Sequence, residues 1–241
     1  MNKKSILVVG ASGSIGSAVA IKLIEQGYKV GLHYCSNRKK VENIKKKYAK
    51  SNKVKIFQSH LATQKDCKDL VNSFKKIYKD FYGLAICAGT VNWKNYHKLN
   101  KNDFDKTFFE IAFMPYFLCY YASKILIKPS RMVYLSSISI KYRGSKESIH
   151  YASAKSALES LMRSLAKYNN KQILINGVRS GFVISNQQKI NKNLNEMKKR
   201  INKIPIKRAG KPEEVAAVFE FLFNDKSSFI HDSIITVSGG D

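Results

Sequence analysis

The chain has 241 residues and a formal net charge of +26, because it carries 43 Lys and Arg residues against 17 Asp and Glu. Its lysines are spread over nearly every predicted helix without a base-reading motif, which disfavours a specific nucleic-acid binder, and its longest apolar runs are too short to cross a membrane. The length suits one α/β domain, and a start that leads directly into a strand, without a signal peptide, predicts a cytoplasmic protein.

The first elements are a strand, a glycine-rich turn and a helix. Residues 5–9 are apolar and β-branched, residues 10–16 have the sequence Gly-Ala-Ser-Gly-Ser-Ile-Gly, and an apolar stripe at helical spacing follows. This order directs backbone N–H groups and the start of a helix at one point, where a phosphate group binds well. The segment therefore predicts a nucleotide-phosphate site.

Strands and helices then alternate to the end of the chain. The sequence predicts strands at residues 28–34, 54–59, 84–88, 132–135, 173–178 and 233–237, and helices at residues 39–50, 65–78, 103–127 (interrupted near Pro115), 151–167 and 212–223. Apolar strands between helices of this length predict an α/β fold, a Rossmann-type doubly wound parallel sheet with helices on both faces, as one domain over residues 1–241. Ligands bind such sheets at the carboxyl ends of the strands, so Gly10, Gly89, Ser137 and Gly181 are expected to converge there.

One polar, basic segment interrupts this alternation at residues 185–203. Leu194, Met197, Ile201 and Ile204 form a narrow apolar stripe within and just after it. We expect a helical substrate lid over the carboxyl edge of the sheet at residues 185–208, although a plain surface helix fits the same pattern.

The spacing Tyr-x-x-x-Lys occurs three times, at Tyr120/Lys124, Tyr142/Lys146 and Tyr151/Lys155. Residues four apart share one face of a helix, and an ammonium near a phenol lowers the phenol pKa from about 10, which suits a tyrosine for proton transfer. In a chain so rich in Tyr and Lys, any single match is typical of a solvated pair on a helix surface. The choice between the three depends on context.

Five motifs in order resemble the short-chain dehydrogenase/reductase family over essentially the whole chain. They are Gly10-x-x-x-Ser14-Ile15-Gly16, Cys87-Ala88-Gly89, Ser137 ahead of Tyr151-x-x-x-Lys155, residues 175–181 (Ile-Asn-Gly-Val-Arg-Ser-Gly), and residues 204–216 with Gly239-Gly240 near the end. The last motif is similar to bacterial members named 3-oxoacyl-acyl-carrier-protein reductases. This context selects Tyr151/Lys155, since Tyr120/Lys124 lacks a preceding strand-end hydroxyl and Gly144 argues against a helix at Tyr142/Lys146.

The resemblance implies catalytic roles for Ser137, Tyr151 and Lys155. A hydride passes from the nicotinamide to a carbonyl carbon, Ser137 donates a hydrogen bond to the carbonyl oxygen, and Tyr151 delivers the proton. Lys155 holds the nicotinamide ribose and lowers the tyrosine pKa, and Ser136 is the alternative for the serine role. The residues expected to contact the cofactor are Gly10, Ser12, Gly13, Ser14, Ile15, Gly16, Ser36, Asn37, Arg38, Leu61, Ala88, Gly89, Tyr151, Lys155, Gly181 and Val183.

The segment after the second strand indicates which cofactor binds. NAD enzymes place an Asp or Glu there to bind the ribose 2′-hydroxyl, but residues 33–39 contain no acid. Ser36, Asn37, Arg38 and Lys39 would instead accept a 2′-phosphate, so we predict NADP(H). The alternative is that Arg38 and Lys39 merely begin a basic helix.

Several positions depart from the family pattern. Ser14 replaces a glycine of the cofactor turn, His60 an adenine-contacting Asp, Cys87 an Asn and Ser180 a proline. Ala112, or Ile111 if the register shifts by one, occupies the place of the Asn that orients a proton-relaying water. His150, beside Tyr151, is expected to be a surface or loop residue rather than a substitute base.

The four scattered cysteines, Cys35, Cys67, Cys87 and Cys119, are expected to be reduced and buried, without a metal site. The substrate class implied by the resemblance is a small carbonyl or alcohol compound, including one carried on an acyl carrier protein, and the family suggests a homotetramer or homodimer. Two other functions stay open. One is a catalytically degenerate NADP(H)-binding sensor, and the other is a basic binder of nucleic acid or anionic surfaces.

Overall fold

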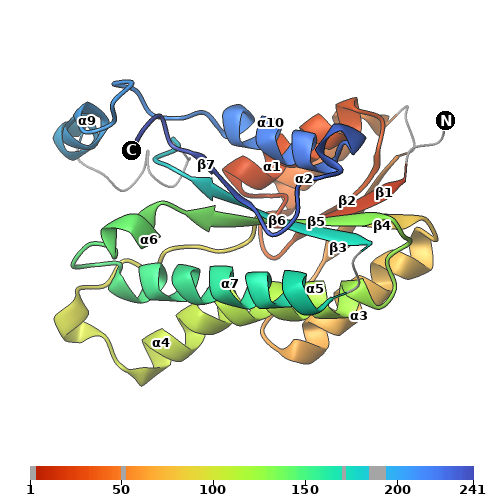
Figure 1. Ribbon diagram of the computed structural model, residues 1–241, viewed down its shortest axis with the longest axis horizontal. Coiled ribbons are helices and arrows are strands. Elements are labelled where there is room, and N and C mark those ends of the chain that lie inside the picture. The colour runs from red at the N-terminus through yellow and green to blue at the C-terminus, as the bar shows by residue number, and fades with distance from the viewer. Residues whose placement is uncertain (1–3, 50–52, 170–171, 185–193) are drawn as a thin grey trace.

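Seven parallel strands form one sheet in the order β3-β2-β1-β4-β5-β6-β7 (Figure 1). The computed structural model describes residues 4–49, 53–169, 172–184 and 194–241. The strands are β1 Ser5–Val9, β2 Lys29–Tyr34, β3 Val54–Gln58, β4 Phe81–Ile86, β5 Ser130–Ser137, β6 Ile173–Ser180 and β7 Ile234–Val237. Because β1 pairs with both β2 and β4, the strand order reverses at β1, where sheets of this kind bind ligands at the carboxyl ends.

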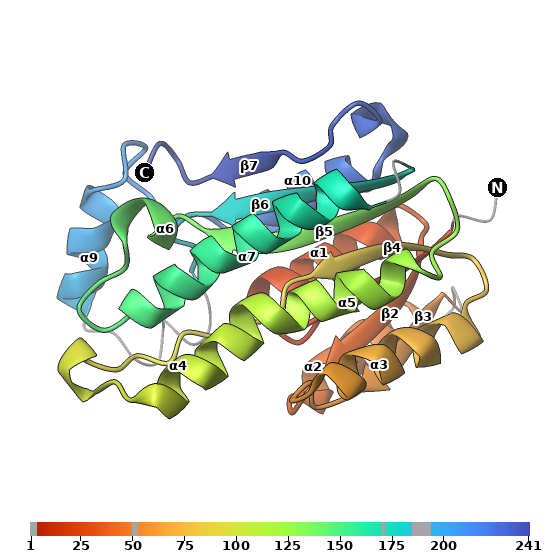
Figure 2. The same ribbon diagram turned by 60° about the horizontal axis from the view of Figure 1, so that its bottom comes forward.

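Helices cover both faces of the sheet. One layer contains α1 Ser14–Glu25, α2 Arg38–Lys47 and α10 Pro212–Phe223; the other contains α3 Gln64–Ile77, α4 Lys101–Phe108, α5 Met114–Ser123 and α7 Ile149–Tyr168 (Figures 1 and 2). Each layer has its own apolar core. Ile6 and Val8 of β1 belong to the first core and Leu7 and Val9 to the second, as the period of two along a strand requires.

Two further helices lie at the carboxyl end of the sheet, α6 Ser139–Tyr142 and α9 Leu194–Asn202 (Figure 1). The sequence did not predict α6, nor the short 3-10 helices η2 Tyr96–Lys98 and η4 Asp225–Ser227. Of the predicted lid, residues 185–193 lie outside the described residues. The described part contains α9 and the segment that follows it to residue 208.

The predicted fold class is confirmed, and the long predicted helix is interrupted as expected. Its halves, α4 and α5, are joined by a π-helical turn, η3 Phe109–Phe113, immediately before Met114 and Pro115. Ala112 lies in this turn and is fully buried. Because π-helical turns are frequent at functional sites, this turn indicates that a functional site lies nearby.

The four cysteines are free, and Cys67, Cys87 and Cys119 are buried as expected. Cys35 is exposed, which corrects the expectation for that residue, because it lies in the loop beyond the end of β2. Within the described residues, no helix is both long and apolar enough to cross a membrane.

Candidate active site

The glycine turn after β1 is packed so closely that two of its glycines leave no room for a side chain. Gly10 has a φ of +82°, and a Cβ there would lie 2.7 Å from the backbone of Ala88. A Cβ on Gly16 would lie 2.2 Å from the Gly10 carbonyl oxygen. Ser14 begins α1 in ordinary helical conformation, which explains why a serine is tolerated at a glycine position. The N-cap residue Gly13 has no side chain to cap α1, so N–H groups of its first turn can receive an anion.

Strand β5 delivers its two terminal serines to opposite sides. The Ser136 hydroxyl is buried and donates to Glu159 Oε1 at 2.6 Å, and Arg179 Nε also donates to that oxygen at 3.0 Å. The Ser137 hydroxyl instead lies near the Tyr151 phenol, whose pKa it lowers, and accepts the N–H of Ser139 at 3.1 Å. Because successive side chains of a strand point to opposite faces, only Ser137 faces the tyrosine.

Tyr151 and Lys155 lie on the first two turns of α7, beside the end of β5. Lys155 is 3% exposed, its Nζ donates to the Leu135 carbonyl oxygen at 2.7 Å, and this Nζ lies 5.7 Å from the centroid of the Tyr151 ring. Burial raises the pKa of Tyr151 to about 12, although the neighbouring Ser137 hydroxyl opposes this shift. The prediction that Lys155 lowers the pKa of Tyr151 is therefore wrong for the protein alone, since desolvation of the phenol outweighs any effect of the ammonium.

The Lys155 side chain is almost completely removed from solvent. Burial lowers the pKa of Lys155 to about 8, although Cys87 and Glu159 oppose this shift. Burial raises the pKa of the Cys87 thiol to about 12, so the thiol is neutral at physiological pH. Ala112 contributes only a methyl group to the core where the family's Asn is expected.

The cationic side chain that contacts the glycine turn is Lys40, which the sequence analysis missed. Its Nζ donates to the Gly13 carbonyl oxygen at 3.4 Å from the first turn of α2. Arg38 Nε instead donates to Glu42 at 2.7 Å along the outer face of α2. Asn37 caps α2 by accepting the N–H of Lys40 at 3.3 Å. Lys40 lies two residues after Arg38, in the first turn of α2. Its position in the first turn of a predicted basic helix is the signal that could have identified it.

The other predicted cofactor residues lie at ends of the same strands. Gly89 follows β4 with a φ of +132°, and Gly181 follows β6 with its N–H bonded to the Val237 carbonyl oxygen at 2.8 Å. Val183 pairs with Gly210. Ser12 is half-buried within the glycine turn, Ser36 is exposed after β2, and Leu61 is half-buried after β3. All of these lie at the carboxyl edge, as predicted.

His150 is fully buried in α7, which corrects the expectation of a surface or loop position. Its Nε2 bonds to the Asn92 carbonyl oxygen at 2.9 Å, and the N–H groups of Lys94 and Tyr96 donate to the carbonyl oxygens of Glu147 and Lys146 at 3.0 and 2.8 Å. The segment after β4 therefore covers the start of α7. Within the described residues, no group of three or more His, Cys, Asp or Glu side chains could hold a metal ion.

Comparisons with known proteins place the chain in a family and a fold. Residues 10–241 match a family model described as enoyl-(acyl carrier protein) reductase. The 3-oxoacyl-acyl-carrier-protein reductase FabG of Buchnera aphidicola is 30% identical, over 100% of this chain and 98% of the relative. A short-chain dehydrogenase/reductase from Serratia marcescens superposes with a TM-score of 0.90 at 22% identity, over 98% of this chain and 97% of its own. The structure of BdcA in complex with NADPH has a TM-score of 0.86 at 24% identity, over 98% and 93%.

Proposed function

The chain belongs to the short-chain dehydrogenase/reductase family, and from this premise we propose that it is an NADP(H)-dependent reductase of carbonyl compounds that also catalyses the reverse oxidation of alcohols. The observation that carries the proposal is the placement of Ser137, at the end of β5, beside Tyr151 and the buried Lys155 of α7. This triad lies at the sheet edge that also holds the tightly packed glycine turn.

The residues of the triad have separate tasks. When bound, NADPH supplies the hydride that reduces the carbonyl carbon. The Ser137 hydroxyl donates a hydrogen bond to the carbonyl oxygen, and Tyr151 transfers its phenolic proton to the same oxygen, which becomes the alcohol hydroxyl. A Tyr151 pKa of about 12 keeps the phenol protonated at neutral pH, as a proton donor requires. Lys155 would hold the nicotinamide ribose.

The protein's own residues fit this cofactor. A Cβ on Gly10 or Gly16 would collide with the backbone, so both positions require glycine. Glycines leave the backbone uncovered at the start of α1, and a pyrophosphate can approach it closely. The loop after β2 has no carboxylate to repel a 2′-phosphate. Lys40 and Ser36 are the groups that we propose for the 2′-phosphate, while Arg38 would have to leave Glu42 to take part.

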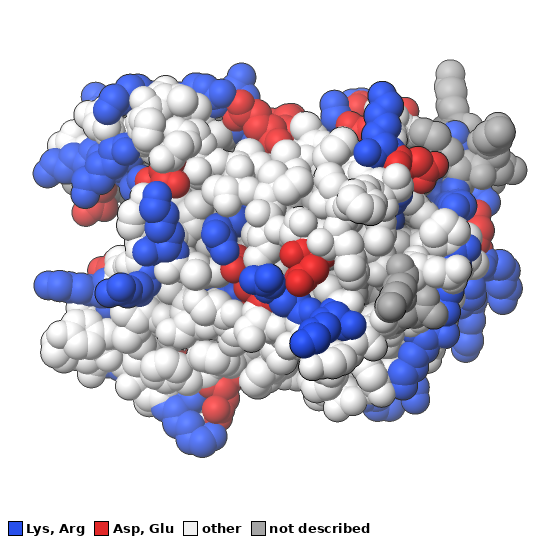
Figure 3. Space-filling model, in the orientation of Figure 1, with Lys and Arg blue, Asp and Glu red and all other residues white. Residues whose placement is uncertain are grey.

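We further propose a 3-oxoacyl thioester carried on an acyl carrier protein as the substrate. The similarity to a FabG relative supports this class. In addition, the exposed residues Lys198, Lys199 and Lys203 lie in and after α9 at the carboxyl edge, where they would attract an acidic carrier (Figure 3). If this is the case, KM for the carrier-bound substrate rises with salt, while KM for the same acyl group on a small thiol stays constant.

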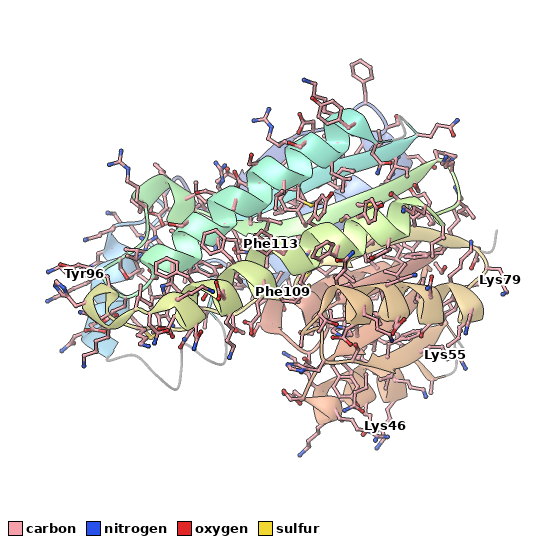
Figure 4. All side chains as sticks on the ribbon, turned by 90° about the horizontal axis from the view of Figure 1, so that it is seen from below. Lys46, Lys55, Lys79, Tyr96, Phe109 and Phe113 are labelled. Atoms are coloured by element: carbon pink, nitrogen blue, oxygen red, sulfur yellow. The ribbon has the colours of Figure 1, made fainter. Side chains whose placement is uncertain are left out.

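An oligomer is supported by aromatic side chains on the outer face of α4, η3 and α5. Phe104 and Phe113 are 37% and 42% exposed, and Figure 4 shows Phe109 and Phe113 on this face, away from the lysine-bearing end at Lys46, Lys55 and Lys79. We propose that a second copy of the chain covers them, as a dimer or tetramer. Light scattering should give a mass of at least two chains, and Phe113→Lys should reduce it to one.

The alternative is a sensor that binds NADP(H) without turnover, and two observations favour it. Ala112 offers only a methyl group, which cannot bind a relay water, and Cys87 replaces an asparagine with a neutral thiol. NADPH consumption measured across a carbonyl panel, including 3-oxoacyl thioesters, decides between the two. Turnover of any member supports the reductase, whereas tight NADPH binding without turnover of any substrate supports the sensor.

A further inference from the structure

His33 joins two segments that flank the predicted cofactor site. It lies in β2, between β1 and β3, and is 3% exposed. Its Nδ1 accepts the N–H of Gly10 at 3.2 Å, and its Nε2 lies 3.1 Å from the carbonyl oxygen of Ser59. Gly10 begins the glycine turn, and Ser59 begins the loop that leads to Leu61.

These contacts define one protonation state. A carbonyl oxygen can only accept, so Nε2 carries the proton, and Nδ1 is then free to accept from Gly10. The neutral Nε2–H imidazole satisfies both partners. A histidinium would direct an Nδ1–H group at the Gly10 N–H group, and the turn would lose this bond.

Both backbone polar groups of Gly10 are hydrogen-bonded. Its N–H group donates to His33, and its carbonyl oxygen accepts the N–H of Gly13 at 3.0 Å. The next residue, Ala11, donates its N–H to the His33 carbonyl oxygen at 2.8 Å. Both the side chain and the backbone of His33 therefore orient the turn from which α1 starts.

On this geometry, and resting on the proposed function, we propose that His33 is a positioning residue for NADP(H). Its neutral imidazole ties the glycine turn to the loop after β3, so that the pyrophosphate and adenosine sides of the cofactor site keep their relative position. The two loops belong to different strands, and this side chain bonds to both.

Burial protects this state against acid. It lowers the pKa of His33 to about 4, and the hydrogen bond to Ser59 opposes the shift only in part. Among the described residues, no charged side chain contributes to this pKa. Because Leu32 and Tyr34 pack in the core beside α1 and α2, the alternation along β2 directs His33 to the α3 side of the sheet. The titratable groups in the first turn of α3 are Lys65, Asp66 and Cys67. The imidazole is therefore neutral at physiological pH and becomes charged only as the pH approaches 4.

Three substitutions separate the two bonds. In His33→Asn an amide oxygen occupies the position of Nδ1 and can accept from Gly10; in His33→Gln the amide reaches the position of Nε2 and can bond to Ser59; His33→Phe keeps neither bond. We expect the NADP⁺ Kd, measured by calorimetry at pH 7.5, to stay within about 3-fold in the Asn variant. It should rise about 10-fold in the Gln and Phe variants, which lose the Gly10 bond.

His231 provides a matched control. Its Nδ1 accepts the N–H of Ile175 and its Nε2 lies near the Ala166 carbonyl oxygen, both at 3.2 Å, so it bridges two backbone groups in the same manner. It lies ahead of β7, at the opposite edge of the sheet. His231→Phe should lower Tm and leave the NADP⁺ Kd unchanged.

The test at low pH uses the NADP⁺ Kd of the wild type divided by that of His33→Asn. Titration of the 2′-phosphate of NADP⁺ affects both proteins equally and cancels in this ratio. The ratio should stay constant from pH 7.5 to about 5 and rise below that. Nitrogen NMR of the histidine rings in the wild-type protein needs no variant. We expect it to show His33 as the neutral Nε2–H tautomer between pH 8 and 5.

Four outcomes would each overturn the positioning role alone. They are unchanged NADP⁺ binding in His33→Phe, an equal loss of binding in His231→Phe, an Nδ1–H tautomer of His33, and titration of His33 near its ordinary pKa. A wild-type protein that binds neither NADP⁺ nor NAD⁺ would overturn the proposed function and this role with it.

Discussion

Two Tyr-x-x-x-Lys pairs on neighbouring helices have the same spacing and different environments. On α5, Lys124 Nζ donates to the Tyr120 hydroxyl at 2.8 Å, at the protein surface. On α7, Lys155 Nζ donates to the Leu135 carbonyl oxygen, and the Tyr151 phenol lies near the Ser137 hydroxyl. The pair in direct contact is therefore not the one at the sheet edge.

The difference shows that the strands, and not the spacing, make the site. The end of β5 supplies Leu135 and Ser137 as partners, and burial beside it raises the pKa of Tyr151 and lowers that of Lys155. The pair on α5 lies at the protein surface, and exposed pairs of this kind contribute little. Variants made in parallel on both pairs test this comparison.

Replacement of the two lysines should show the largest difference between the two pairs, apart from replacement of the tyrosines themselves. We expect Lys155→Met to lower kcat/KM about 100-fold or more, because the ammonium that holds the ribose and assists proton transfer is lost. Lys124→Met should stay within about 2-fold. Steady-state NADPH oxidation measures both, and equal losses in the two variants would mean that the spacing alone matters.

The two serines at the end of β5 give the next comparison. Ser137→Ala should lower kcat about 10- to 100-fold, because a hydrogen bond to the developing oxyanion is lost. Ser136→Ala should keep kcat and lower Tm, since it removes the bond to the buried Glu159. The reverse pattern would assign the catalytic role to Ser136.

The pH dependence should follow Lys155. Its charged form is present below its pKa of about 8 and is lost as the pH rises through that value. If the ammonium is required, kcat/KM for NADPH, which reports the protein without cofactor, falls about 10-fold per pH unit above 8. Lys155→Arg should move this limb to higher pH, and a wild-type profile that stays flat to pH 10 would exclude a role for the charge.

Restoring the missing asparagine should have the smallest effect. Ala112→Asn places an amide in the π-helical turn, where it could bind a relay water, so kcat should rise about 3-fold. The larger side chain in a fully buried position should cost about 1–3 kcal/mol of unfolding free energy, which denaturant titration measures. An intact variant with unchanged kcat would mean that protons reach Lys155 by another path.

The fold could be predicted because strand and helix periodicities run through the chain without conflict. The convergence of the glycine turn and Ser137 follows from the order of strands, since parallel strands bring their carboxyl ends to one edge. The choice of Tyr151/Lys155 among three equal spacings rested on the resemblance to the short-chain dehydrogenase/reductase family. Element bounds were less accurate. Strand β5 continues through Ser136 and Ser137 because it pairs with β6 over its whole length, a tertiary contact that local sequence does not reveal.

Side-chain environments could not be predicted. Arg38 and Lys40 are both basic residues at the start of α2, but the first bonds to Glu42 and only the second turns toward Gly13. His150 is buried because a segment more than fifty residues earlier, at Asn92, folds over it. The raised pKa of Tyr151 likewise depends on surroundings assembled from several elements.

The most direct test of the account removes one hydroxyl from each pair. Tyr151→Phe and Tyr120→Phe are assayed side by side for NADPH oxidation with a carbonyl substrate that the wild type reduces. We predict that Tyr151→Phe loses about 1,000-fold or more of kcat while still binding NADPH, and that Tyr120→Phe keeps wild-type kcat. Preserved turnover in Tyr151→Phe would contradict the account.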